Sequence, residues 1–227
     1  MAKAGAGAAL RRRVYKESRR AMVGKTTRMA SNPFALFELE PGPALDAAAL
    51  KEQFARATSE SHPDKFGHAS EAEQLEAGTR YAALNQAYQT LIDPRARLLA
   101  LYELTKGAKP PDIQRIPPGT MDLFKEVGEM CRELDSFLEK KKATTNRLEK
   151  AGLMSEELGL QDRLTDLRMK LEAFGATVDA DLASLDTRWR SGDKDLAALE
   201  AVYRKYSYVA RWRQQLEERE IELLTGE

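Results

Sequence analysis

The two histidines of the chain lie in one short stretch, together with a carboxylate. His62 is followed by Pro63 and Asp64, and His68 lies six residues after His62. Such a set could bind a metal ion or be presented to another protein. A zinc site needs about four ligands, and these three side chains share one loop without a fourth. Pro63 keeps the residue before it extended and cannot donate a backbone hydrogen bond. The motif therefore favours two polar side chains displayed at a fixed corner.

The rest of the sequence offers little other chemistry. Cys131 is the only cysteine. A disulfide framework or a cysteine-based zinc module within the chain is therefore excluded. We expect Cys131 itself to be buried and to pack as a small apolar side chain. No nucleophile–base set, phosphate-binding loop or metal cluster is evident. We therefore expect no enzyme activity, no cofactor and no bound metal. No apolar run approaches the roughly 20 residues that span a membrane.

The net charge of zero hides an asymmetry. Residues 1–30 hold nine basic side chains and one acidic one, and the remainder holds 27 basic and 35 acidic residues. We expect residues 1–31 to form a disordered or marginally helical basic extension and the protein to be cytoplasmic in a bacterium. An Arg-rich, acid-poor leader is also typical of transit peptides, which would indicate the mitochondrial matrix. The extension lacks the interleaved aromatics of nucleic-acid binders, so no nucleic-acid partner is expected.

Residues 32–106 read as four helices. A short segment begins at Asn32, and a second helix runs from an N-cap at Asp46 to about Ser61. A third begins near Ser70, where Ser70 and Glu73 make a capping-box pattern, and ends near Leu91. A fourth follows after a proline and covers 95–104. The middle two helices are predicted to form an antiparallel hairpin whose connecting loop carries His62-Pro63-Asp64.

A Pro-rich linker at 107–118 separates these helices from a second all-α region. In 119–227, apolar residues recur at steps of three and four, and breaks between helices are expected near Gly152 and at 191–193. This pattern predicts an elongated antiparallel three-helix bundle. Its middle helix would span roughly 50 Å. Tyr203 and Tyr206 are expected to face the core, and the 140–142 lysine run to be a solvated face. The predicted core stripes are Phe124, Val127, Cys131, Leu134 and Leu138; Leu160, Leu164, Leu167, Leu171, Phe174, Val178, Leu182 and Leu185; and Leu196, Leu199, Tyr203, Tyr206, Val209 and Leu216.

The sequence motifs that flank His62-Pro63-Asp64 resemble those of a known family. The stretch HPDKF at 62–66, then LNQAYQTL at 84–91, then DPRAR at 93–97 resembles a J domain. A J domain of this wording, followed by a short linker and a three-helix bundle, resembles the HscB family, the J-type co-chaperones of iron–sulfur cluster assembly. The sequence shows no Gly/Phe-rich segment and no Cys-x-x-Cys repeat. Their absence agrees with this subfamily.

The resemblance implies that the protein docks on an ATP-bound DnaK/HscA-type chaperone and accelerates its ATP hydrolysis. Asp64 would pair with an arginine of that chaperone, His62 would supply a hydrogen bond, and Pro63 would hold the two apart. The catalytic site would belong to the partner.

The basic face that the family uses beside this motif is thin here. Lys51, Arg56 and Lys65 would contribute to chaperone binding, and Glu52 and Glu60 oppose them. We therefore expect weaker electrostatic steering toward the chaperone.

The resemblance also implies a client, an IscU-like scaffold protein held by the bundle. Its binding patch would come from the first bundle helix and an aromatic residue of the last helix. The stretch around Gly128 can be aligned with the client-binding helix of the family in two registers. Phe124 and Val127 are each equally compatible with a place in the core and a place on the client-binding surface. The candidate client-binding residues are Leu123, Phe124, Val127, Glu129 and Tyr208.

Two other functions remain open. The bundle could bind a different client or tether the chaperone to another complex. Less compatible with the intact motif is a structural coiled-coil protein with a vestigial J domain.

Overall fold

The computed structural model describes residues 32–111 and 116–225, and no strand occurs within these ranges. The chain divides into two compact units, with the division between Thr105 and Lys106. We call the described residues of the first the J-like unit and those of the second the bundle. The basic extension predicted at 1–31 lies outside the described residues. The fold class is all-α, as the sequence predicts.

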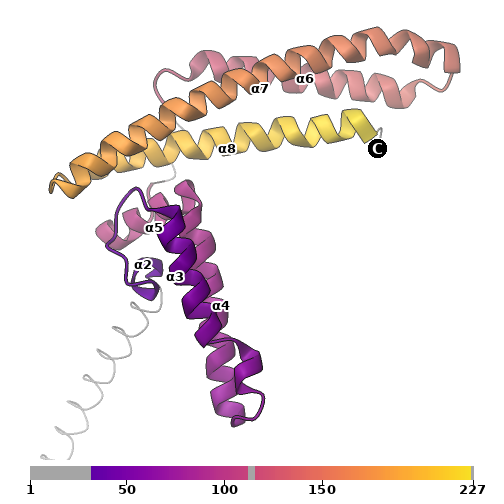
Figure 1. The fold of residues 1–227 in the computed structure, drawn as a ribbon. Coiled ribbons are helices and arrows are strands. Elements are labelled where there is room, and N and C mark those ends of the chain that lie inside the picture. Colours follow the sequence, from indigo (N-terminus) through magenta and orange to yellow (C-terminus); the bar gives the residue numbers. More distant parts are fainter. Residues whose placement is uncertain (1–31, 112–115, 226–227) are drawn as a thin grey trace, which may run out of the picture. The chain divides into compact units, whose positions relative to one another are not determined.

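The J-like unit contains α2 (Pro33–Leu36), α3 (Ala47–Glu60), the 3-10 turn η1 (Pro63–Phe66), α4 (Glu71–Ile92) and α5 (Pro94–Lys106), with α3 and α4 side by side as a hairpin (Figure 1). These bounds agree with the prediction to within two residues. Helix starts are fixed by short polar side chains. Asp46 accepts hydrogen bonds from the N–H groups of Ala48 (2.9 Å) and Ala49 (3.1 Å), which satisfies donors that the helix itself leaves unpaired.

An apolar core and one buried arginine hold these helices together. Phe54 of α3 stacks on Tyr88 of α4 with ring centroids 4.2 Å apart. Arg97 is only 6% exposed, and its guanidinium donates to the carbonyls of Pro43 (2.8 Å) and Leu91 (2.5 Å). Arg97 therefore joins the loop before α3 to the end of α4. The fully buried members of the core are Phe34, Leu50, Leu84, Leu91, Leu98 and Leu101.

The bundle consists of α6 (Met121–Ala143), α7 (Arg147–Arg190) and α8 (Leu196–Thr225) (Figure 1). The break predicted near Gly152 is wrong. The α6–α7 turn precedes it, because Asn146 caps α7 by accepting from the N–H of Leu148 (2.9 Å), and Gly152 lies inside the helix. At 44 residues, α7 is about 66 Å long, longer than the roughly 50 Å expected.

Ion pairs at a regular interval set α6 against α7. Glu126–Lys170, Glu133–Arg163 and Lys140–Glu156 join nitrogen and oxygen atoms 2.5–2.6 Å apart. Successive pairs advance seven residues along α6 and retreat seven along α7, so the two helices are antiparallel. We call these three pairs the ion-pair ladder.

The sequence suggested that the lysine run at the end of α6 is a solvated face. In the structure, all three lysines make ion pairs with neighbouring helices. Lys140 belongs to the ladder, Lys141 binds Glu157 (2.9 Å) and the carbonyl of Leu223 (3.0 Å), and Lys142 binds Glu222 (2.6 Å). The positive charge at this helix end therefore joins α6 to both of its neighbours.

The core stripe of α7 is largely as predicted, but that of α8 differs. Tyr203 and Tyr206 are only half-buried, and the Tyr206 hydroxyl donates to Asp179 (2.5 Å). Val202 and Trp212 are buried instead, and Val209 is buried as predicted. A tyrosine hydroxyl needs a polar partner when buried, so these rings lie at the edge of the core.

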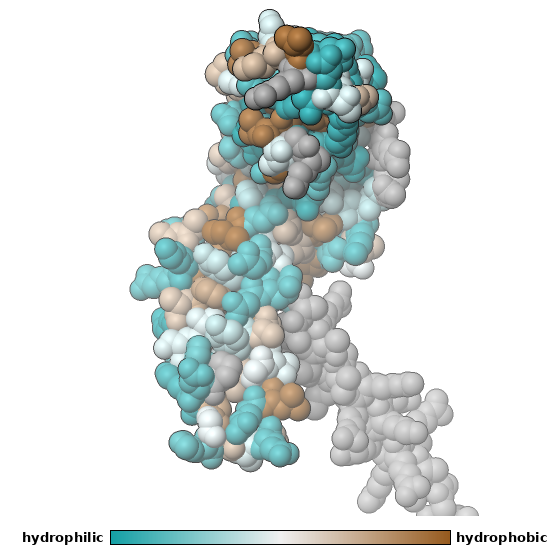
Figure 2. Space-filling model, turned by 90° about the vertical axis from the view of Figure 1, so that its right-hand side faces the viewer, coloured by the Kyte–Doolittle hydropathy of each residue, from teal (hydrophilic) through white to brown (hydrophobic). Residues whose placement is uncertain are grey.

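On the face drawn in Figure 2, hydrophilic residues predominate and hydrophobic ones appear as separate patches. Within the described ranges, every helix is too short or too polar to cross a bilayer.

Candidate functional site

The loop carrying His62, which we call the HPD loop, is a short and tightly bonded connection. Its first residue is extended, with φ −63° and ψ 129° at His62, as a following proline demands. η1 then begins at Pro63, and the N–H of Lys65 donates to the carbonyl of His62 (3.0 Å). The α3 end is closed by Ser61, whose side chain donates to the carbonyl of Ala57 (2.9 Å).

The α4 end of the loop is held by the predicted capping box. Glu73 accepts hydrogen bonds from the Ser70 hydroxyl (2.7 Å) and from the Ser70 N–H (2.9 Å). These two bonds, the hydroxyl's first, hold the pKa of the Glu73 carboxyl below its ordinary value. The loop is therefore fixed at both ends by local hydrogen bonds.

Within the loop, His62 and Asp64 are linked to each other. Nδ1 of His62 accepts from the backbone N–H of Asp64 (3.3 Å) and lies 3.5 Å from its Oδ2. Because Nδ1 accepts, a neutral His62 carries its proton on Nε2. The side chains are 46% and 90% exposed, respectively. The loop thus presents one N–H donor and one carboxylate to a partner.

Tyr81 of α4 contacts this site, a role that the sequence did not predict. Its ring and the His62 imidazole are edge-on, with centroids 5.5 Å apart and planes at 82°. This contact limits the rotation of the imidazole. The sequence did contain a signal for this contact. Tyr81 lies two to three helical turns after the capping box, on the helix that follows the loop and packs antiparallel to the helix before it.

Carboxylates gather beside the loop. A hollow of about 220 Å³ is lined by Glu60, Glu73 and Glu76 together with Arg80. The basic candidates Lys51, Arg56 and Lys65 are all exposed. The sequence predicted that positive charge is sparse near the motif. The structure adds that carboxylates of α3 and α4 lie together beside it, which depends on how these two helices pack.

On the bundle, the structure separates the client candidates. Val127 is 2% exposed and belongs to the core, because it shares one side of α6 with Met130 and Leu134. It cannot present its side chain to a client, so that prediction is corrected. Phe124 is 42% exposed, Glu129 is exposed and Leu123 is half-buried.

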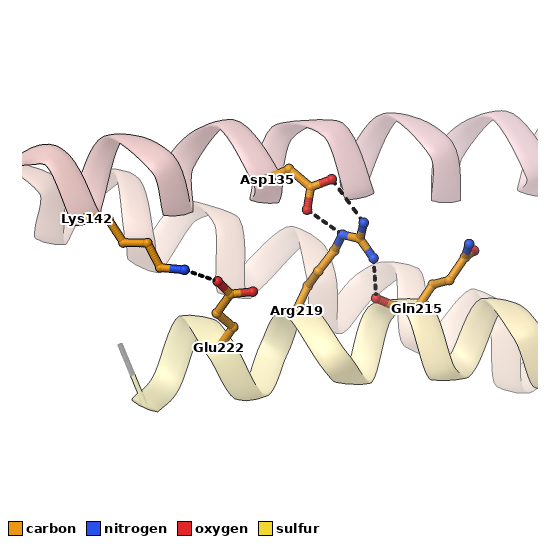
Figure 3. A network of polar contacts seen from close by, with 5 residues as sticks. All are labelled: Asp135, Lys142, Gln215, Arg219 and Glu222. Atoms are coloured by element: carbon orange, nitrogen blue, oxygen red, sulfur yellow. Dashed lines mark hydrogen bonds and ion pairs between the residues drawn. The ribbon is translucent and has the colours of Figure 1, made fainter. Parts of the chain in front are cut away.

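The ion pairs between α6 and α8 decide where Tyr208 lies. Arg219 makes two bonds to Asp135 (2.7 and 3.0 Å) and one to the Gln215 carbonyl (3.0 Å), and Lys142 pairs with Glu222 (Figure 3). The two helices therefore run in the same direction, with partners 80–84 positions apart.

That offset puts Phe124 and Tyr208 at one level of neighbouring helices. Tyr208 is half-buried, and its ring lies 5.5 Å from Trp212 and 5.7 Å from the Arg211 guanidinium. We call the surface formed by Phe124 and Tyr208 the α6/α8 face. Glu129 lies three residues after Glu126 and four before Glu133, on the side of α6 whose carboxylates pair with α7. The structure therefore separates Glu129 from the two aromatic candidates.

In the described part of the chain, neither unit shows a metal centre. No group of three or more His, Cys, Asp or Glu side chains there could hold a metal ion. Cys131 is partly buried rather than fully buried, and burial, opposed by Arg219, raises the pKa of its thiol. A raised pKa disfavours the reactive thiolate.

Comparison with known proteins gives consistent similarities. No family model matches the chain. It is 40% identical over 76 residues to the "Co-chaperone protein HscB homolog" of Haemophilus ducreyi, a stretch that covers 34% of this chain and 44% of that protein. A Shewanella protein of the same description is 40% identical over 73 residues, covering 32% and 42%. The chain thus spans less than half the length of these curated relatives.

Solved structures extend the likeness. Chaperone HscB from Vibrio cholerae aligns with a TM-score of 0.56 and 27% identity, over 85% of this chain and 99% of that one. Human co-chaperone protein HscB aligns with a TM-score of 0.58 over 83% and 82%, and at 17% identity it supports the fold alone. The chain is therefore HscB-like, resembling the HscB co-chaperones in sequence over about a third of its length and in fold over most of it.

Proposed function

We propose that the protein is a co-chaperone of iron–sulfur cluster assembly. It docks through the HPD loop on a DnaK/HscA-type chaperone, stimulates the ATPase of that partner, and delivers an IscU-like scaffold protein bound to the bundle. The observation that carries the proposal is the exposed His62/Asp64 pair, which hydrogen bonds fix on a capped hairpin.

The geometry suits recognition rather than catalysis. A carboxylate as exposed as that of Asp64 can accept two parallel bonds from an arginine, so binding depends on orientation as well as charge. The Nε2–H of His62 offers a further donor. Such contacts accelerate hydrolysis only if they bind the hydrolysis-competent state of the chaperone more tightly than its other state.

The acidic hollow beside the loop bears on the rate of docking. Carboxylates next to the motif reduce long-range attraction to an acidic chaperone surface, whereas the short-range Asp64–arginine pair is unaffected. Association is therefore expected to be slow, with little dependence on salt.

Steady-state ATP hydrolysis by a DnaK/HscA-type chaperone tests the loop. The unaltered chain should stimulate hydrolysis, and His62→Gln or Asp64→Asn should remove the stimulation. His68→Gln is the matched control, because His68 is exposed on the same connection and is assigned no role. Stimulation that persists in Asp64→Asn, or that is absent from the unaltered chain, would contradict the proposal.

Calorimetric binding of an IscU-like protein tests the bundle. Phe124→Ser and Tyr208→Ala should weaken binding, whereas Met169→Ser should not, since Met169 is a comparably exposed apolar side chain of α7. If the unaltered chain stimulates the chaperone but does not bind the scaffold protein, the alternative of another client or a tethering role is favoured instead.

A further inference from the structure

The outward side of α7 differs from the outward sides of the other two bundle helices. On α6 and α8, the sides turned away from the core carry exposed charged residues such as Lys125, Arg132 and Glu218. That is the ordinary pattern of a helix with one face in water. On α7, eleven exposed positions follow one another along the outward side at steps of three or four residues, from 151 to 187, and ten of them carry no charge. We call these positions the α7 stripe.

The two halves of the α7 stripe differ in the size of their side chains. The first half contains Met154, Leu158 and Met169, whose exposed fractions are 63%, 57% and 57%. In the second half, positions 173, 176, 180 and 183 are all alanine, and Asp162 is the one charged member of the stripe. The remaining members are Ala151, Thr165 and Thr187. An apolar surface that is continuous along a helix indicates contact with another molecule.

The length of the α7 stripe suits another helix. From 151 to 187 it spans 36 residues, or about 54 Å along the helix axis. A helix–helix contact of that length and about 10 Å wide buries about 1,100 Å² over both partners, near the lower limit of specific interfaces. The association should therefore be specific but readily reversible. The α7 helix of a second copy has both this length and the same uncovered side.

Side-chain size and charge both favour an antiparallel pair. In that orientation, Met154 and Leu158 of each copy face the alanines of the other, so that large residues meet small ones at both ends. A parallel pair would put large residues against large ones and alanine against alanine, and the helix axes could not keep one distance. It would also bring the two Asp162 carboxylates together, whereas antiparallel copies centred on Met169 hold them about 21 Å apart.

We propose that the α7 stripe is the contact surface of a reversible antiparallel dimer of this chain, with its two-fold axis near Met169. In a three-helix bundle, the outward side of one helix lies opposite the groove between the other two. Pairing through α7 therefore leaves the α6/α8 face uncovered in both copies. The pairing does not depend on the proposed function, and substitutions in the stripe should leave client binding unchanged.

Sedimentation equilibrium of the full chain tests the pairing. The unaltered chain should interconvert between monomer and dimer as its concentration changes. Ala176→Glu and Ala180→Glu should each raise the Kd of the dimer at least about tenfold, because each puts a carboxylate against the apolar side of the other copy. Ala82→Glu makes the same change at an exposed alanine of α4 and should leave the Kd unchanged. A monomer at every concentration, or an equal response of all three variants, would overturn the proposal.

Distances between spin labels in the dimer test its orientation. Cys131→Ser removes the only cysteine, and Asp166→Cys or Ser184→Cys then accepts one nitroxide beside the stripe. In the antiparallel dimer, the labels at 184 should lie about 45 Å apart and those at 166 within about 20 Å. Short distances at both positions would indicate parallel chains, and a long distance at 166 would place the contact elsewhere. Either result would contradict the proposed dimer.

Discussion

His62 and Asp64 are two residues apart, and a local turn with capped ends sets their geometry. Phe124 and Tyr208 are 84 positions apart and share a level only because ion pairs fix the offset of α6 against α8. The HPD loop can therefore keep its shape while the rest of the molecule changes. The α6/α8 face exists only as long as two long helices keep their register.

The two units are stabilised in correspondingly different ways. In the J-like unit, the helices are fixed by caps, an aromatic stack and the buried Arg97. In the bundle, exposed ion pairs recur along all three helices. Exposed pairs contribute little stability, about 0.2–1 kcal/mol each. Their value to the bundle is that a shifted register would place like charges together.

The largest effect should follow from removing the buried arginine. Arg97→Met leaves the Pro43 and Leu91 carbonyls unpaired and should lower the free energy of unfolding of the J-like unit by about 3 kcal/mol. Far-UV circular dichroism in urea reports both units. Fluorescence reports the bundle alone, because both tryptophans, Trp189 and Trp212, lie there. Only the dichroism transition should move. Arg95→Met, an exposed neighbour, is the control, and an equal loss there would contradict the assignment.

Breaking the ion-pair ladder should have a smaller effect on the other unit. Changing Glu126, Glu133 and Glu156 together to Gln should cost the bundle about 1–2 kcal/mol at low salt, since all three pairs are exposed. The fluorescence transition should shift, and the shift should shrink as salt rises. Replacing Glu149, Glu172 and Glu217, which no ladder pair uses, controls for the change of charge. A salt-independent loss would indicate a packing role instead.

Tyr81 tests whether the loop is positioned from outside its own residues. Tyr81→Ala should raise the concentration for half-maximal ATPase stimulation about fivefold, or about 1 kcal/mol, without lowering the maximum. Tyr81→Phe keeps the ring contact with His62 and should restore the original value. Gln89→Ala, exposed on the same helix, should have no effect. A lower maximum with unchanged half-saturation would instead place Tyr81 in the stimulation step.

The smallest effect concerns the cap at the start of α4 and depends on pH. The folded state lowers the pKa of Glu73, so its carboxylate stabilises the J-like unit above the pKa of the unfolded chain. That contribution is lost as the pH falls through the lower pKa of the folded state. Amide exchange at the first turn of α4 should quicken over this acidic range, and Glu73→Gln should remove the dependence. A dependence unchanged in that variant would assign it to another group.

The local part of this protein was predictable. The capping box at Ser70, the extended residue before Pro63 and the helix of the J-like unit that begins after Asp46 depend on neighbours in sequence, and the structure agrees with each. The predicted helix break near Gly152 was wrong for two reasons. An exposed glycine inside a helix costs only modest stability, and Asn146 is a better N-cap, so α7 begins earlier.

Sequence alone determined the fold class, the division of elements and the composition of the HPD loop, because turns, caps and apolar periodicity act over a few residues. Only the tertiary structure decided that Val127 is core and Phe124 surface, that Tyr81 contacts His62, and that Tyr208 lies level with Phe124. Those facts depend on which sides of distant helices meet and at what offset. Helical periodicity defines the sides of each helix but leaves the offset between helices open, and here the ion pairs between the long helices fix it.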